Sequence, residues 1–338
     1  MNGRYFDGPR PLRGPVPPPS TPKAGVRTDL AVEAVGPQPI PGVNIDRVEE
    51  DGIVVSRVQV ETYQAAQQIG KAPGRYITVD AARLRERERQ TQERVAAIIG
   101  RELRYLLGVP KDAEIFVVGL GNWRATPDAL GPRVVENLMV TRHMWDHVPP
   151  DLRGGLRPVS ALAPGVLGIT GIETWDIISS IVDRIRPAAV VAVDALAAMD
   201  LSRIVTSVQL ADTGIHPGSG VGNRRTGITR ETVGVPVIAI GVPTVVHAVT
   251  IASQTIDMLV ARLRAENRFY ELLGAMEGND KYDLIREILS PAVGDLMVTP
   301  KEIDILIEDM AYVVAAGINQ ALHPDVDSVD FASAFPIH

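Results

Sequence analysis

The chain has 338 residues, of which 45% are apolar and 22% charged, as is typical of a soluble globular protein with a large core. It contains no cysteine, which excludes disulfides, zinc–thiolate sites, iron–sulfur clusters and a cysteine nucleophile. The net charge of −7 argues against nonspecific nucleic-acid binding. Neither a membrane-length apolar run nor a hydrophobic signal core is found, so we expect an intracellular protein without membrane contact.

The N-terminal segment 1–26 is rich in proline and basic residues and poor in apolar ones. Such a segment cannot bury enough surface to offset its ordering entropy, so a disordered tail is predicted. Residues 53–60 and 76–79 have strand composition. Asp80 is the predicted N-cap of a long amphipathic helix over residues 81–107.

Strands and helices alternate through the middle of the chain. The predicted strands are continuous apolar runs, which is typical of a parallel sheet buried on both faces. The sequence therefore predicts an α/β fold with a mostly parallel sheet, helices on both faces and a helical C-terminal third. The predicted strands are 114–118, 188–193, 204–210 and 235–240, and the predicted helices are 133–145, 175–186, 245–263 and much of 266–321.

Three aspartates follow predicted strands. Asp128 lies in the loop after residues 114–118, Asp194 directly follows 188–193, and Asp212 follows 204–210. Ligands of open parallel sheets bind beyond the carboxyl ends of the strands. Two close carboxylates separate their proton affinities, which leaves one as general acid and the other as general base. The alternative for each aspartate is a helix cap.

A glycine-rich loop, residues 214–223, follows Asp212 and contains His216, Gly218, Gly220 and Gly222. It lacks the Lys-Ser/Thr ending of a P-loop, so we interpret it as a loop that contacts substrate through its backbone. A dinucleotide site is disfavoured because Arg124 occupies the third position of the only candidate fingerprint.

Two histidines, His143 and His147, are spaced to share one face of the predicted helix 133–145 and its end. This spacing suits a metal ion, but no third ligand accompanies it, so surface or core histidines are favoured.

Several long motifs resemble one family. They occupy residues 27–33, 119–132, 171–174, 193–197, 212–223 and 241–246. In these stretches the chain is similar to the spore germination protease family, the endopeptidases that degrade small acid-soluble spore proteins when bacterial spores germinate. The resemblance extends from Arg27 to the C-terminal helices.

The resemblance implies a homotetrameric zymogen that trims its own N-terminus in the cytoplasm of the forespore, the later spore core. It also implies a fold similar to the core of hydrogenase-maturation proteases, with added strands and C-terminal helices. The family is grouped with aspartic peptidases, and Asp128 and Asp194 match its proposed catalytic pair. From its position after a strand, Asp212 stays a reserve candidate for catalysis or substrate binding, and His216, in the glycine-rich loop, is a candidate for substrate binding. No metal or organic cofactor is implied, and the expected partners are small acid-soluble spore proteins.

The self-cleavage site is also implied by the resemblance. Family substrates are cut after an acidic residue within Thr/Ala-Glu-Ile/Phe-Ala-Ser-Glu, and residues 28–33 read Thr-Asp-Leu-Ala-Val-Glu. We therefore predict cleavage between Asp29 and Leu30. This divides the chain into a propeptide, 1–29, and a single catalytic α/β domain, 30–338. The tail before the site is longer and richer in proline than the family pattern.

An alternative from a different class stays open. The chain could be a metal-reading maturation protease or a metal-binding protein that uses Asp128, Asp194 and His216. A pepsin-like architecture is not supported, because Asp212-Thr213-Gly214 is a single copy of the Asp-Thr-Gly signature. The sequence does not assign the acid and base roles within the aspartate pair.

Overall fold

The computed structural model describes residues 28–36, 39–145, 147, 149, 153, 155–217, 225–265, 284–285, 287 and 296–324. The predicted disordered tail lies outside these residues, as do Gly218, Gly220 and Gly222 of the glycine-rich loop. Most of the stretch between residues 266 and 295, predicted to be mainly helical, also lies outside them.

One mixed sheet organises the described part of the chain. Its strand order is β1-β2-β3-β7-β8-β6-β4-β5, and β9 pairs with β8. The strands β5, β4, β6 and β8 are parallel, whereas β7, β3, β2 and β1 are added antiparallel. The strands are β1 (Val43–Glu50), β2 (Ile53–Val60), β3 (Gly74–Asp80), β4 (Ile115–Gly119), β5 (Val159–Leu162), β6 (Ala189–Ala198), β7 (Ser207–Ala211), β8 (Val237–His247) and β9 (Met297–Val298).

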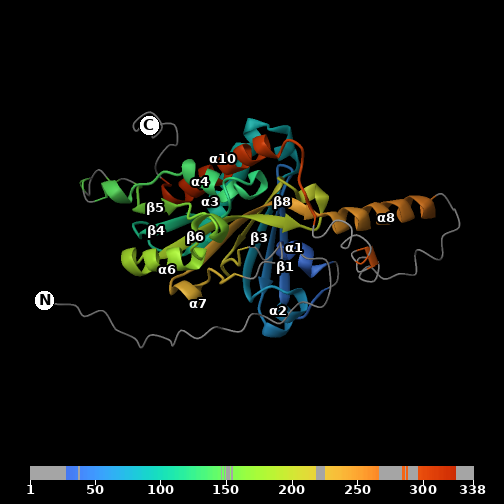
Figure 1. The fold of residues 1–338 in the computed structure, drawn as a ribbon, viewed down its shortest axis with the longest axis horizontal. Coiled ribbons are helices and arrows are strands. Elements are labelled where there is room, and N and C mark those ends of the chain that lie inside the picture. The colour runs from blue at the N-terminus through green and yellow to red at the C-terminus, as the bar shows by residue number, and fades with distance from the viewer. Residues whose placement is uncertain are drawn as a thin grey trace.

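Helices cover both faces of this sheet, which confirms the predicted α/β class (Figure 1). The sheet is mixed rather than mostly parallel, because β7, β3, β2 and β1 join it as antiparallel strands. Alternate strand residues point to opposite faces. Val117, Val191 and Ile240 pack under α3, α4 and α10, whereas Phe116 and Val190 pack under α6 and α7. The helices are α1 (Ala31–Val35), α2 (Tyr63–Ile69), α3 (Arg89–Leu107), α4 (Leu130–Glu136), α5 (Leu167–Thr170), α6 (Thr174–Ile185), α7 (Arg230–Val233), α8 (Ala248–Ala265) and α10 (Ile303–Leu322), with 3-10 turns η1 (Ala82–Glu86), η2 (Thr126–Asp128), η3 (Arg142–Met144) and η5 (Leu201–Arg203).

The antiparallel half of the sheet begins with a tight hairpin. Asp51 and Gly52 connect β1 to β2, and both have positive φ, 52° and 78°. Asp-Gly with two positive φ angles is the preferred two-residue hairpin connection. Local turn chemistry therefore places β1 and β2 side by side, and β3 extends the meander towards β7.

Several predicted boundaries are wrong. Asp80 ends β3 instead of capping a helix, and its carboxylate accepts hydrogen bonds from Arg203 and Ser207. The long predicted helix 81–107 is η1 followed by α3. The helix predicted over 133–145 ends at Glu136, so His143, in η3, and His147 do not share a helix face. The strand that was predicted to stop before Asp194 continues to Ala198.

The helix α10 is the one helix in the described ranges that is long and apolar enough to cross a membrane. It packs against α3 and α4 and buries eleven residues, including Val314 and Ile318. At the α3 contact, a Cβ on Gly100 would lie 3.1 Å from the backbone oxygen of Gly317. This close approach is typical of a core helix.

The close packing of α4, which begins two residues after Asp128, against the end of β4 leads to a prediction about stability. A Cβ on Gly131 would lie 2.2 Å from the backbone oxygen of Leu120, so Gly131→Ala must displace the helix. We expect a loss of about 3 kcal/mol in unfolding free energy, as for other overpacked cores. Gly168→Ala, in α5 with nothing within 4 Å of the added Cβ, is the control and should be neutral in thermal unfolding. Equal melting temperatures for the two variants would contradict the prediction.

Candidate active site

The candidate site is built on one row of paired residues across the sheet. Gln209 of β7 pairs with Gly241 of β8, and Gly241 pairs with Asp194 of β6. Paired positions on neighbouring strands place their side chains on the same face. Gln209 and Asp194 therefore lie on the same face, two strand spacings or about 10 Å apart. Gly241 has no side chain between them, and the side chain of Leu196 lies over it.

Asp194 is buried inside β6, with 6% of its surface exposed. The N–H of Ala195 donates a hydrogen bond to its Oδ1 at 2.9 Å. Burial raises the pKa of Asp194 well above its usual value, and the negative charges of Asp128 and Asp29 raise it further. The side chain is therefore protonated under conditions in which an ordinary aspartate is ionised.

Asp128 reaches the site from the loop after β4. The turn folds back on itself at Gly121, where φ is 118° and a Cβ would lie 2.0 Å from the backbone oxygen of Asp128. The N–H of Asn122 donates a hydrogen bond to Asp128 Oδ2 at 2.9 Å. The turn η2, which ends at Asp128, packs against both β6 and β8. The loop thus brings Asp128 close enough for its charge to act on Asp194.

The two carboxyl groups have different environments. Burial also raises the pKa of Asp128, but the Asn122 hydrogen bond and the positive charge of Arg225 oppose the rise. Asp194 experiences the stronger rise, because it is more deeply buried and lies near two other carboxylates. Two neighbouring carboxyl groups with separated proton affinities can hold one proton between them as an acid–base pair.

Asp212 does not join this pair. Its Oδ1 accepts a hydrogen bond from the Arg75 N–H at 2.7 Å, and its Oδ2 one from Arg75 Nε at 2.8 Å. These bonds tie the end of β7 to β3, so Asp212 has a structural contact that sequence reasoning did not predict.

His216 packs against Gly227, where a Cβ would lie 2.7 Å from His216 Nε2. Its pKa is lowered by desolvation and then by the positive charge of Lys71. Within the described parts of the chain, no group of three or more His, Asp or Glu side chains could hold a metal ion. No observation therefore supports a metal site made of Asp128, Asp194 and His216.

The predicted cleavage segment lies beside β6. The N–H of Asp29 donates to the Ala197 carbonyl at 3.0 Å, and the N–H of Ala197 donates to Asp29 Oδ2 at 2.9 Å. Leu30 is fully buried in a small apolar cluster with Val32 and Leu196. The structure therefore places Asp29 and Leu30 alongside the last residues of β6, which follow Asp194.

Two side chains bind the carbonyl oxygen of Asp29. Lys71 Nζ donates to it at 2.8 Å, and Gln209 Nε2 donates at 3.0 Å. Lys71 Nζ also donates to the Thr28 carbonyl at 2.9 Å, and Gln209 Oε1 accepts from the Ala31 N–H at 2.7 Å. The backbone on both sides of the Asp29–Leu30 bond is therefore fixed by the same pair of residues.

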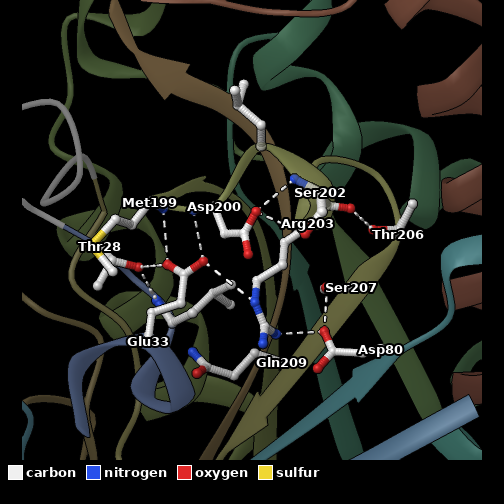
Figure 2. Close-up of polar contacts among 12 residues, drawn as sticks. Thr28, Glu33, Asp80, Met199, Asp200, Ser202, Arg203, Thr206, Ser207 and Gln209 are labelled. Atoms are coloured by element: carbon white, nitrogen blue, oxygen red, sulfur yellow. Dashed lines mark hydrogen bonds and ion pairs between the residues drawn. The ribbon is translucent and has the colours of Figure 1, made fainter. Parts of the chain in front are cut away.

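Glu33 anchors the other end of this segment (Figure 2). Its carboxylate accepts hydrogen bonds from the N–H groups of Met199 and Asp200, at 2.9 and 3.0 Å, and from the Thr28 hydroxyl. Arg203 Nε lies 3.5 Å from Glu33 Oε1, and the Glu33 side chain is only 3% exposed. Figure 2 shows Arg203 placed between Glu33 and Asp80, so one guanidinium joins the segment to β3.

Sequence reasoning missed the residues that bind the segment, namely Lys71, Gln209 and Arg203, and also Arg225. Gln209 left a usable signal, because it is a polar residue between the apolar residues Val208 and Leu210 of the buried strand β7. Lys71 left none, since it lies in the turn between α2 and β3 and no local pattern marks it.

A family model described as germination protease matches residues 29–268 and 261–335. The chain belongs to the germination protease family. A germination protease from Caldanaerobacter subterraneus subsp. tengcongensis is 51% identical over 307 residues, which cover 89% of this chain and 95% of that protein. One from Bacillus cereus strain 03BB102 is 44% identical over 352 residues and covers 90% of this chain and 95% of that protein. The chain is therefore a germination-related protease, a peptidase whose substrates are proteins.

Among solved structures, a [NiFe] hydrogenase maturation protease, HycI from Thermococcus kodakarensis KOD1, matches 64% of this chain and 98% of its own. The sequence identity is 16% and the TM-score 0.32. A likeness of this size carries no argument about function.

Proposed function

We propose that the chain is an atypical aspartic endopeptidase that begins the degradation of small acid-soluble spore proteins during germination. The observation that carries this proposal is the packing of η2, which ends at Asp128, against β6, where buried Asp194 feels the charge of Asp128 and Asp29 is docked. A carboxyl pair next to a held peptide bond is the arrangement that acid–base hydrolysis requires. The membership of the family supports the choice of substrate class.

The environments of the two aspartates support a division of roles. Asp128, the group with the smaller rise in pKa, takes a proton from water as the water oxygen bonds to the scissile carbonyl carbon. The carbon–nitrogen bond then breaks, and Asp194 gives its proton to the leaving amine. The products are a carboxyl group and a free amine, and the proton taken by Asp128 restores Asp194 for the next reaction.

The same site is proposed to process its own chain. Cleavage between Asp29 and Leu30 would release a propeptide, 1–29, from a catalytic domain, 30–338. The docked segment supports this, because Asp29 already lies beside β6 with its carbonyl bound. We further propose that the enzyme is a homotetramer in the forespore and spore-core cytoplasm and that it needs no cofactor.

Self-processing gives a direct test. The purified full chain, incubated at pH 5 and at pH 7 with and without a chelator, should yield a product that begins at Leu30 in mass spectrometry. The cleaved chain should also degrade a small acid-soluble spore protein with chelator present, since the proposed pair needs no metal. An active enzyme that retains residues 1–29 would overturn self-processing, and dependence of cleavage on a divalent cation would favour the metal alternative.

A further inference from the structure

The carbonyl oxygen of Asp29 accepts hydrogen bonds from two side chains. A backbone carbonyl beside a strand normally accepts from a backbone N–H. Here the donors are two side chains from distant elements, Lys71 from the turn before β3 and Gln209 from β7. One donor is an ammonium group, and hydrogen bonds from charged donors are about twice as strong as neutral ones.

These donors lie on the aspartate side of the sheet. Gln209 is in the same row as Asp194, with only Gly241 between them, and both side chains point to the same face. The charge of Asp29 acts on Asp194, and the charge of Lys71 acts on His216. The carbonyl oxygen of Asp29 therefore lies between Lys71 and Gln209, and Gln209 belongs to the row of paired residues that includes Asp194.

This arrangement matches what amide hydrolysis needs at the carbonyl oxygen. Attack by water moves an electron pair from the carbonyl bond onto oxygen, and donors aimed at that oxygen stabilise the charge as it forms. The Lys71 ammonium and the Gln209 amide are already within hydrogen-bond distance before reaction, so they need no reorganisation. Burial strengthens both interactions, because less water surrounds them. Burial also lowers the pKa of Lys71, whereas the negative charges of Asp29 and Glu33 oppose that change and favour the ammonium form.

We propose that Lys71 and Gln209 are catalytic residues that bind the carbonyl oxygen of the bond to be cut and stabilise the oxyanion formed there. This inference rests on the proposed function, with Asp29–Leu30 as the bond that is cut. It also completes the division of roles, because Lys71 supplies the positive charge at oxygen and leaves the Asp194 proton for the amine. The second contact of Gln209, to the Ala31 N–H, fixes the leaving side of the bond.

Lys71 and Gln209 form a clamp whose hydrogen bonds to the segment all go to backbone atoms. Lys71 binds the carbonyls of residues 28 and 29, and Gln209 binds the carbonyl of residue 29 and the N–H of residue 31. A clamp of this kind acts on any extended peptide that lies in the same place. We therefore expect it to serve protein substrates as well as the chain's own segment.

The test compares Lys71→Met and Gln209→Glu with Lys111→Met in the full chain. Gln209→Glu keeps an acceptor for the Ala31 N–H and loses the donor to the Asp29 oxygen. Lys111 is an exposed lysine in the turn before β4 and serves as the matched control. The first-order rate of Asp29–Leu30 cleavage, followed by mass spectrometry, should fall about 10²–10³-fold in the first two variants, as for loss of other oxyanion donors. It should not change in the control.

Amide hydrogen exchange separates catalysis from simple docking. Residues 29–35 are followed in the Asp194→Asn chain, which we expect to stay uncut, with and without Lys71→Met. The inference requires that the cleavage rate falls at least ten times more than the exchange protection. A Lys71→Met chain that cuts at the wild-type rate, or a rate loss matched by an equal loss of protection, overturns it. A wild-type chain that cuts neither itself nor a spore protein overturns both proposals, so the two failures are distinguishable.

Discussion

Replacement of Asp194 by asparagine is expected to lower cleavage of a small acid-soluble spore protein by at least about 10³-fold, because the amide cannot protonate the leaving amine. The matched control is Asp176→Asn, an exposed carboxylate in the first turn of α6, which should keep wild-type activity. Initial rates of cleavage, measured by gel or mass spectrometry, test this prediction. Normal turnover by Asp194→Asn would remove this residue from the mechanism.

The same variant should be more stable than the wild type at neutral pH. The pKa of Asp194 is raised in the folded state, so the unfolded chain loses this proton first as pH rises. Stability from the protonated group is complete below the ordinary aspartate pKa and is lost as pH rises towards the folded value. The loss is about 1.4 kcal/mol for each unit of pKa shift. Thermal unfolding of the two proteins should therefore coincide near pH 3 and diverge at pH 7, with Asp194→Asn melting higher.

Replacement of Glu33 by alanine is expected to undock the cleavage segment. The Glu33 carboxylate is 3% exposed and binds two backbone N–H groups and Arg203. Removal of one partner from such a buried charged contact costs about 3 kcal/mol or more. That energy corresponds to about a 10²-fold smaller docked population, so self-cleavage at Asp29 should slow by a similar factor.

Hydrogen exchange over residues 28–36 and the rate of self-cleavage should change together in this variant. Glu49→Ala, at an exposed position on β1, is the control and should alter neither measurement. If Glu33→Ala cuts itself as fast as the wild type, the anchor is not needed for presentation of the bond, and the docked segment has another role.

Much of the fold follows from sequence patterns, and its departures have physical causes. The apolar run at 188–193 predicts the start of β6, but a carboxylate inside a buried strand is costly and therefore looks like a strand end. The strand continues because residues 195–198 pair with β8, and Asp194 avoids the cost of a buried charge by holding a proton. Burial and pairing of this kind depend on contacts between distant segments and are not visible locally.

The candidate site, like the fold, follows only in part from the sequence. Strand ends and family motifs predict Asp128 and Asp194 as a catalytic pair, and this pairing stays a prediction. The structure packs η2, which ends at Asp128, against β6, where the charge of Asp128 acts on Asp194. The ligands of the cleavage segment were not predicted, since Lys71, Gln209 and Arg203 converge on it from three separate stretches. Asp212, by contrast, looked equivalent in sequence, and only its two bonds to Arg75 reveal a structural role.

The anchor at Glu33 has a consequence for what happens after the bond is cut. The contacts of Leu30 with Leu196, and of Glu33 with Met199, Asp200 and Arg203, all lie on the C-terminal side of the bond. Hydrolysis between Asp29 and Leu30 breaks none of them. The newly formed amino terminus would remain bound beside β6 as part of the enzyme and would compete with protein substrates for that place. Release of this new amino terminus from its place beside β6, rather than hydrolysis of the bond, would then limit how soon the processed enzyme can bind a protein substrate.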